Sequence, residues 1–268
     1  MQLPFFRTKM IALSGVGSTL VLVGVVRLLL LWRSVKANQR YWERRAGEDI
    51  EPGDFIYLAL GDSVASGIGS SRPTKGYVGL IAQHIKAKTG RHVHVINTSV
   101  TGAKTIDVIR EQLPRIGNLQ PDLVTLDIGA NDVNKKVPEE VIIQNFKEIL
   151  DRLPAKKTIV SDLPTFQRGP QRSTLLRLNT AIHDEITNHD FELAPIFEVT
   201  SATIHDVRTY AADLFHPSNR GHRNWYRAFA PGLDDVLDRD DRQHWRRSGA
   251  VIDVASDPVE GTALSLEE

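Results

Sequence analysis

The sequence contains no cysteine among its 268 residues, so disulfides and all thiolate-based sites are excluded. It also lacks net charge, because 33 basic side chains balance 33 acidic ones. A chain without a basic excess has no general attraction for nucleic acid, and we expect no such partner. Nine histidines and many carboxylates remain, and they leave acid–base chemistry open.

A long apolar run occurs only near the N-terminus. After a short segment, residues 1–9, the stretch Met10–Trp32 is apolar or small apart from Arg27. Its length of roughly 23 residues is enough to cross a bilayer core, so it predicts a transmembrane helix or signal anchor. A buried soluble helix and a cleaved signal peptide are the alternatives. For the latter, Val35-Lys36-Ala37 offers the small residues that cleavage requires.

Basic side chains flank this run unequally. Two precede it, Arg7 and Lys9, and five follow it: Arg33, Lys36, Arg40, Arg44 and Arg45. That balance by itself favours a cytoplasmic location for the C-terminal side, although large domains translocate against such a bias. We expect a single-pass N-terminal anchor with the folded domain outside the cytoplasm. Secretion after signal cleavage is the alternative.

Strands alternate with helices in the middle of the chain. Apolar runs predict strands at Phe55–Leu60, His92–Ile96, Leu123–Ile128, Thr158–Val160 and Phe191–Ala194. Helical periodicity predicts helices at Tyr77–Lys88, Val141–Leu153, Leu175–Thr187 and Gly221–Leu237. The alternation predicts an α/β fold with a mostly parallel sheet covered on both faces.

This pattern also predicts the domain limits. One folded domain is expected over residues 54–238. A polar juxtamembrane linker is expected over 33–53, and a disordered tail over 239–268.

Four short segments lie where a parallel sheet usually holds its functional residues, at the carboxyl ends of strands. They are Leu60-Gly-Asp-Ser-Val-Ala-Ser-Gly67, Asn97-Thr-Ser-Val-Thr-Gly102, Ile128-Gly-Ala-Asn-Asp132 and Asp213-Leu-Phe-His-Pro217. Taken singly, each has an ordinary structural explanation, because serine and asparagine often cap helices and glycine often forms turns. Their common position at the ends of strands and their order along the chain indicate a functional site.

Together these segments resemble the blocks of the SGNH, or GDSL-type, hydrolase family, over roughly residues 55–229. The residues after which that family is named are Ser63, Gly102, Asn131 and His216 in this sequence. The resemblance implies a flavodoxin-like three-layer α/β/α sandwich with a five-stranded sheet, and ester hydrolysis without metal or cofactor. It implies that Ser63 is the nucleophile, His216 its base and Asp213 the acid that orients His216. The Ser63 and Gly102 N–H groups and the Asn131 side chain would form the oxyanion hole.

The expected function is that of a membrane-anchored serine esterase acting on acyl esters of lipids or carbohydrates through an acyl-enzyme. Acyl transfer from the same intermediate and a catalytically inactive, tethered binding module are the alternatives. The sequence does not indicate the oligomeric state.

Other residues receive weaker assignments. Asp206 is a second candidate for the acid, and His92 and His94 are expected to be exposed strand residues rather than metal ligands. Pocket shape is expected to depend on three loops: Ser70–Gly76, Val133–Pro138 and Leu163–Arg172.

Overall fold

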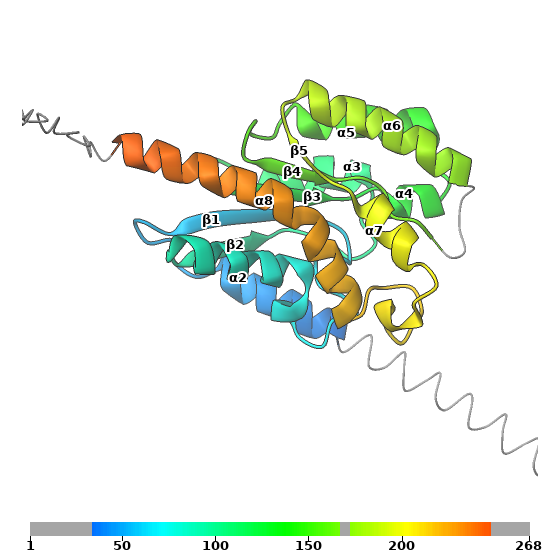
Figure 1. Cartoon of the computed structure of the whole chain (residues 1–268), viewed down its shortest axis with the longest axis horizontal. Coiled ribbons are helices and arrows are strands. Elements are labelled where there is room, and N and C mark those ends of the chain that lie inside the picture. The colour runs from blue at the N-terminus through cyan, green and yellow to red at the C-terminus, as the bar shows by residue number, and fades with distance from the viewer. Residues whose placement is uncertain (1–33, 167–171, 248–268) are drawn as a thin grey trace, which may run out of the picture.

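The computed structural model describes residues 34–166 and 172–247. Five parallel strands form one sheet in the order β2-β1-β3-β4-β5. They are β1 (Phe55–Gly61), β2 (Val93–Asn97), β3 (Leu123–Asp127), β4 (Thr158–Ser161) and β5 (Glu192–Ala194). Helices cover both faces of this sheet (Figure 1), which confirms the predicted α/β/α sandwich with flavodoxin-like strand order.

The two helical layers have different members. One layer contains α2 (Tyr77–Thr89) and α8 (Asn219–Arg247), and the other contains α5 (Glu139–Leu150) and α6 (Arg172–Asn188). Shorter elements complete the fold: α3 (Thr105–Asp107), the helical turns η2 (Val108–Gln112) and η3 (Leu113–Arg115), α4 (Ala130–Asn134), α7 (Ile196–Thr203), and the 3₁₀ turns η1 (Pro73–Lys75) and η4 (Val207–Thr209).

Strand β1 shows why its sequence is a continuous apolar run. Successive side chains of a strand point to opposite faces. Phe55, Tyr57 and Ala59 accordingly pack in the core beside α2 and α8, whereas Leu58 and Leu60 pack in the core beside α5 and α6. A central strand of a covered parallel sheet is buried on both faces, so both alternating sets must be apolar.

Residues 34–46 form a helix, which corrects the expectation of a linker over 33–53. Trp42 is only 5% exposed and packs in the core beside α2. The Asn38 side chain donates to the Gly67 carbonyl (3.0 Å), just beyond β1, and the Arg45 guanidinium donates to the first carbonyl of β2 (2.8 Å). The helix therefore begins at the carboxyl edge of the sheet and runs back to the amino edge.

The C-terminal boundary also differs from the expectation. Helix α8 continues to Arg247, nine residues past the domain end expected at 238. Residues 248–268 and the apolar run Met10–Trp32 lie outside the described residues. Within 34–166 and 172–247, no helix has the length and hydropathy needed to cross a bilayer.

The two histidines near β2 differ from each other. His92 remains 54% exposed beside Asp54, whereas His94 is 1% exposed, which contradicts the expectation that it is a surface residue. Burial lowers the pKa of His94, and the nearby positive charge of Arg45 lowers it further, so the ring stays neutral in the core. The described part of the chain holds no group of three or more side chains suited to bind a metal ion.

Candidate active site

Ser63 lies in the tight turn that directly follows β1. The Asp62 carboxylate accepts a hydrogen bond from the Val64 N–H (2.9 Å), and the Ser63 carbonyl accepts one from the Ile68 N–H (2.9 Å). These bonds close the turn from both sides. Ser63 is therefore held at the carboxyl edge of the sheet, 5% exposed, and lines a pocket.

His216 lies on the loop between η4 and α8. The Asp213 Oδ1 atom accepts hydrogen bonds from the backbone N–H groups of Phe215 and His216, both at 3.0 Å. Tyr210 and Pro217 form an antiparallel bridge at the base of the loop. The loop is thus a closed structure in which acid and imidazole are fixed three residues apart.

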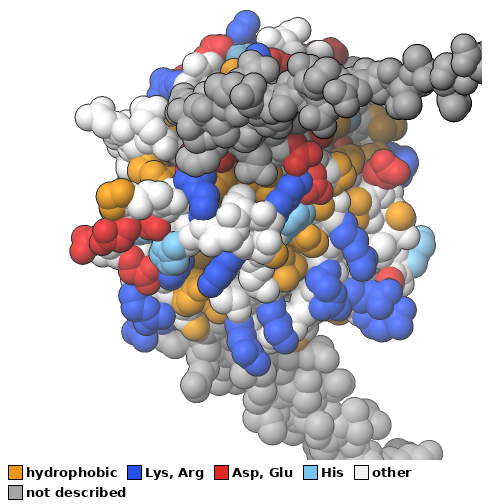
Figure 2. Space-filling model, turned by 60° about the vertical axis from the view of Figure 1, so that its left-hand side comes forward, with side chains coloured by type: hydrophobic (Ala, Val, Ile, Leu, Met, Phe, Trp, Pro, Cys, Tyr) orange, Lys and Arg blue, Asp and Glu red, His pale blue; other side chains and the backbone are white. Residues whose placement is uncertain are grey.

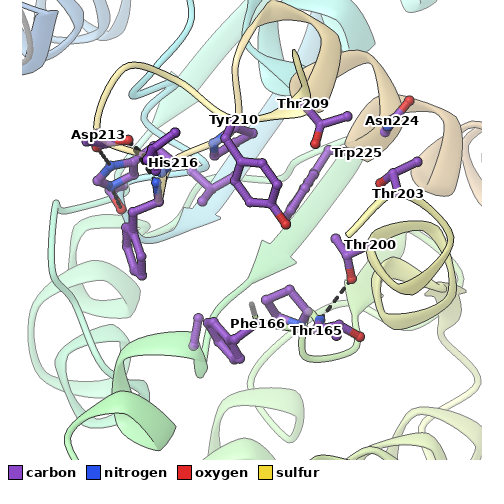
Figure 3. A pocket seen from close by; sticks show the side chains of 18 of the residues that line it. Thr165, Phe166, Thr200, Thr203, Thr209, Tyr210, Asp213, His216, Asn224 and Trp225 are labelled. Carbon is purple, nitrogen blue, oxygen red and sulfur yellow. Dashed lines mark hydrogen bonds and ion pairs between the residues drawn. The ribbon is translucent and has the colours of Figure 1, made fainter. Parts of the chain in front are cut away.

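The structure brings Ser63, His216 and Asp213 into one hydrogen-bonded row. The His216 Nδ1 atom lies 2.6 Å from Asp213 Oδ2, and His216 Nε2 lies 3.0 Å from Ser63 Oγ (Figure 3 shows the acid and the imidazole). A carboxylate accepts hydrogen bonds only, so the Nδ1 atom carries the proton and Nε2 is free to accept from the serine hydroxyl.

Asp213 remains ionised in this arrangement. Burial raises the pKa of Asp213, but the hydrogen bonds from His216 and from the Phe215 N–H outweigh burial and lower the pKa overall. Asp206, the second candidate for the acid, instead pairs with Arg208 (2.8 Å) and Arg220 (3.1 Å).

Two contacts fix the serine turn, one with the histidine loop and one with α8. A Cβ atom on Gly69 would lie 2.4 Å from the Pro217 carbonyl oxygen, so only glycine permits this approach. His222, at the start of α8, donates from Nε2 to the Ile68 carbonyl (2.9 Å) and accepts at Nδ1 from the Tyr77 N–H (3.3 Å). Burial lowers the pKa of His222 to about 4, which keeps the ring neutral as this pair of bonds requires.

The three expected oxyanion donors have different surroundings. Within the described residues, the N–H groups of Ser63 and Gly102 donate to no protein acceptor. Both N–H bonds of the Asn131 amide are engaged, with Asp62 Oδ2 (2.9 Å) and the Ala103 carbonyl (2.9 Å). An oxyanion would therefore be a third acceptor for the two amide hydrogens of Asn131. The Ser63 and Gly102 N–H groups, in contrast, have no protein acceptor and can donate to an oxyanion alone.

Asp62 and Asp127 form a buried carboxyl pair where β1 and β3 end. Burial raises the pKa of Asp62, and the neighbouring Asp127 charge raises it further. Burial also raises the pKa of Asp127, although hydrogen bonds from Ser161 (2.9 Å) and the Trp225 indole (3.2 Å) oppose the shift. Two negative charges in a site without water repel each other, so ionisation of one carboxyl group opposes ionisation of the other.

A pocket of about 440 Å³ opens beside the serine, and Figure 3 shows its lining. The wall comes from Pro164–Phe166, from α7, from the segment Thr209–Pro217 and from the start of α8. Of the three loops expected to shape the pocket, only Leu163–Arg172 contributes. The lining includes none of the residues of Ser70–Gly76 or Val133–Pro138.

Among the residues that the structure describes, the pocket wall away from the triad is uncharged. The hydroxyl groups of Thr200, Thr203 and Thr209 donate to backbone carbonyls at 2.7, 2.9 and 2.6 Å. Figure 3 shows these threonines around the Trp225 and Tyr210 rings. Because their hydrogens are already used, the wall offers mainly methyl groups and aromatic surface to a ligand.

Sequence reasoning did not single out Asp127 or Trp225. Asp127 accepts the Trp225 indole N–H and thereby holds a ring that lines the pocket. The available signal was a lone acid in the apolar run Leu123-Val-Thr-Leu-Asp-Ile128, since a buried carboxyl group needs polar partners.

Comparison with known proteins identifies the family of the chain. The profile of the GDSL-like lipase/acylhydrolase family matches residues 59–223, and the chain belongs to this family of ester-bond hydrolases. The chain is 38% identical to a lipase of Streptomyces rimosus over 230 aligned positions, and the match covers 63% of this chain and 83% of that protein.

Two solved structures share the fold. The lipase/acylhydrolase from Enterococcus faecalis has a TM-score of 0.58 at 18% identity, covering 69% of this chain and 96% of that one. The acetylxylan esterase Axe2 from Geobacillus stearothermophilus has a TM-score of 0.54 at 19% identity, covering 67% and 94%.

Proposed function

We propose that the chain is a membrane-anchored serine esterase that cleaves acyl esters through a covalent acyl-enzyme on Ser63. The observation that carries this proposal is the hydrogen-bonded row Ser63–His216–Asp213 at the edge of a pocket whose described wall is uncharged away from these three residues. Membership of a family of ester hydrolases supports it.

The first half-reaction forms the acyl-enzyme. Ser63 Oγ attacks the ester carbonyl carbon while its proton passes to His216 Nε2, 3.0 Å away. The ionised Asp213 stabilises the resulting imidazolium through the Nδ1 proton. When the tetrahedral intermediate collapses, the carbon–oxygen bond to the alcohol breaks, and His216 gives its proton to the departing alcohol.

The second half-reaction restores the enzyme. Water attacks the acyl carbon and loses its proton to His216 Nε2, and the acid product leaves as Ser63 regains that proton. In both steps negative charge develops on the former carbonyl oxygen. We assign stabilisation of this charge to the Ser63 and Gly102 N–H groups, with the Asn131 amide as third donor. The Asn131 amide donates hydrogen bonds to the Asp62 carboxyl group and to the Ala103 carbonyl, and these bonds hold it in place before substrate arrives.

The pocket supports a neutral acyl group as the part of the substrate that it holds. A volume of about 440 Å³ lies within the usual range for small-molecule sites. Its wall of threonine methyl groups, Tyr210 and Trp225 has no charged partner for an ionised acyl chain. Acyl esters of lipids and of carbohydrates both fit this description.

The membrane anchor is supported by sequence. Met10–Trp32 has the length and apolar character of a bilayer-spanning segment, and it ends two residues before the described domain begins. We place the catalytic domain outside the cytoplasm, held by this single segment.

Kinetics with p-nitrophenyl esters of increasing chain length test the proposal. We expect turnover by the wild-type chain and its loss in Ser63→Ala. Ser66→Ala is the matched control, since the Ser66 hydroxyl contacts the Asp62 carbonyl (3.1 Å) and Ser99 (2.8 Å) rather than His216. Undiminished hydrolysis by Ser63→Ala would contradict the assignment.

A further inference from the structure

Exposed apolar side chains gather at the end of the molecule that carries the pocket. Val207, Leu214 and Phe215 are 66%, 63% and 52% exposed, and we call these three residues the apolar rim. Leu214 and Phe215 also line the pocket. Val207 lies on η4, whose neighbour Thr209 accepts a hydrogen bond from the Ser218 N–H (2.8 Å), so it belongs to the same loop cluster.

Two further exposed apolar residues lie at the same edge of the sheet. Val141 (45% exposed) is near the start of α5, and Leu176 (46% exposed) is near the start of α6. Both helices follow a strand of the parallel sheet, so both begin at its carboxyl edge. Among the described residues, only one other large apolar side chain is exposed, Ile50, which precedes β1 at the amino edge. The side that comes forward in Figure 2 carries many lysines and arginines.

Two features of Leu214, its backbone conformation and its exposed apolar side chain, are unfavourable in free energy. Its backbone has a φ of 58°, in the left-handed region that disfavours residues with a Cβ atom by roughly 1–2 kcal/mol. Its side chain is also apolar and mostly in solvent. A glycine or asparagine would remove both penalties, and contact with an apolar partner would offset the second for the leucine that is present.

The first described residues of the chain also lie at the end of the molecule that carries the pocket. The Asn38 side chain contacts Gly67 in the serine turn, and Figure 1 places the first described residues (blue) near the yellow segment that contains the apolar rim. Only five residues lie between Trp32, the end of the apolar run, and Asn38. Six residue steps span about 9 Å at the rise of a helix, which is the conformation of residues 34–38.

We propose that the carboxyl edge of the sheet docks on a lipid bilayer through the apolar rim, and that the enzyme takes its ester from lipid molecules in that membrane. This rests on the proposed esterase function and on the anchor formed by Met10–Trp32. A short tether keeps this edge at the bilayer surface, and the rim inserts among the acyl chains. A lipid chain then reaches the pocket beside Ser63 without crossing water.

Depth-dependent quenching tests the orientation directly, and the absence of native cysteine makes it simple. Val207→Cys and the matched control Ile50→Cys are each labelled with an environment-sensitive fluorophore in the full-length chain. Both are then reconstituted in phosphatidylcholine vesicles containing doxyl-labelled lipid. We expect blue-shifted, quenched emission at position 207 and unquenched emission at position 50. Equal quenching at both positions, or quenching at neither, overturns the proposal.

Activity provides a second readout with Val207→Asp and Ile50→Asp. Hydrolysis of a vesicle-borne ester lipid should fall about tenfold in Val207→Asp, which corresponds to about 1.4 kcal/mol of lost insertion energy. Turnover of soluble p-nitrophenyl butyrate in detergent should stay unchanged in both variants. An unchanged rate on vesicles overturns the proposal. The quenching result needs no turnover, so failure of the esterase function is recognised separately by loss of Ser63-dependent hydrolysis.

Discussion

His222 offers a sharp test of how the site is held together. Its ring joins the Ile68 carbonyl of the serine turn to the Tyr77 N–H of α2, and it does so as the neutral imidazole. We predict that His222→Gln removes a large part of the acid sensitivity of folding. Glutamine can still donate to Ile68 but takes up no proton.

The magnitude follows from the pKa of His222. Burial lowers this pKa to about 4 from an ordinary value of 6.5. Between those two values the unfolded chain binds a proton and the folded chain does not, so stability is lost as pH falls from 6.5 to 4. At about 1.4 kcal/mol for each pKa unit, the loss amounts to about 3 kcal/mol. Below pH 4 both states are protonated and His222 adds no further change.

Urea unfolding at pH 7 and pH 4.5, followed by tryptophan fluorescence, measures this effect. At pH 7 the variant should be less stable by about 1 kcal/mol, because the Tyr77 N–H loses its acceptor. The decrease between the two pH values should be smaller than in wild type by about 2–3 kcal/mol. Asp62 and Asp127, whose pKa values are raised, act in the opposite direction, but they are common to both proteins. His205→Gln, at an exposed position, should behave as wild type. Equal pH dependence in wild type and His222→Gln would refute the reasoning.

Three further predictions concern single side chains. Asn131→Ala should lower kcat by about 10²–10³ with little change in KM, and a change in KM alone would count against its role as an oxyanion donor. Asp213→Asn should lower kcat by about 10⁴, because the amide favours the wrong imidazole tautomer; a loss below tenfold would indicate that another acid orients His216. Leu214→Asn should raise the free energy of unfolding by about 1 kcal/mol in detergent, since asparagine tolerates a positive φ. A lower Tm for this variant would show that Leu214 is not strained.

The sequence was informative where local pattern and global fold agree. The predicted strand Phe55–Leu60 ends within one residue of β1, because a doubly buried strand must be apolar and Gly61 ends the run. The serine, histidine and asparagine segments each follow a strand or precede a helix, as a parallel sheet requires. The confirmed sandwich follows from that alternation.

The sequence was uninformative where a few distant contacts decide the structure. The polar composition of residues 34–46 predicts a linker, because only Trp42 among them joins the hydrophobic core and its burial depends on the turn after β1. The engagement of Asn131 by Asp62 depends on two strand ends meeting, and no spacing along the chain reports it. The sequence does not predict that α7 forms part of the pocket wall. Its threonines resemble ordinary surface residues unless the helix is known to lie beside Trp225.

The nucleophile is the central claim, and covalent labelling tests it most directly. The chain is treated with a fluorophosphonate, digested, and mapped by mass spectrometry. The account predicts one adduct, on Ser63, which persists in Ser66→Ala and forms far more slowly in His216→Ala, where the base is missing. An adduct on a different residue, or labelling of Ser63 at an unchanged rate without the His216 imidazole, would contradict it.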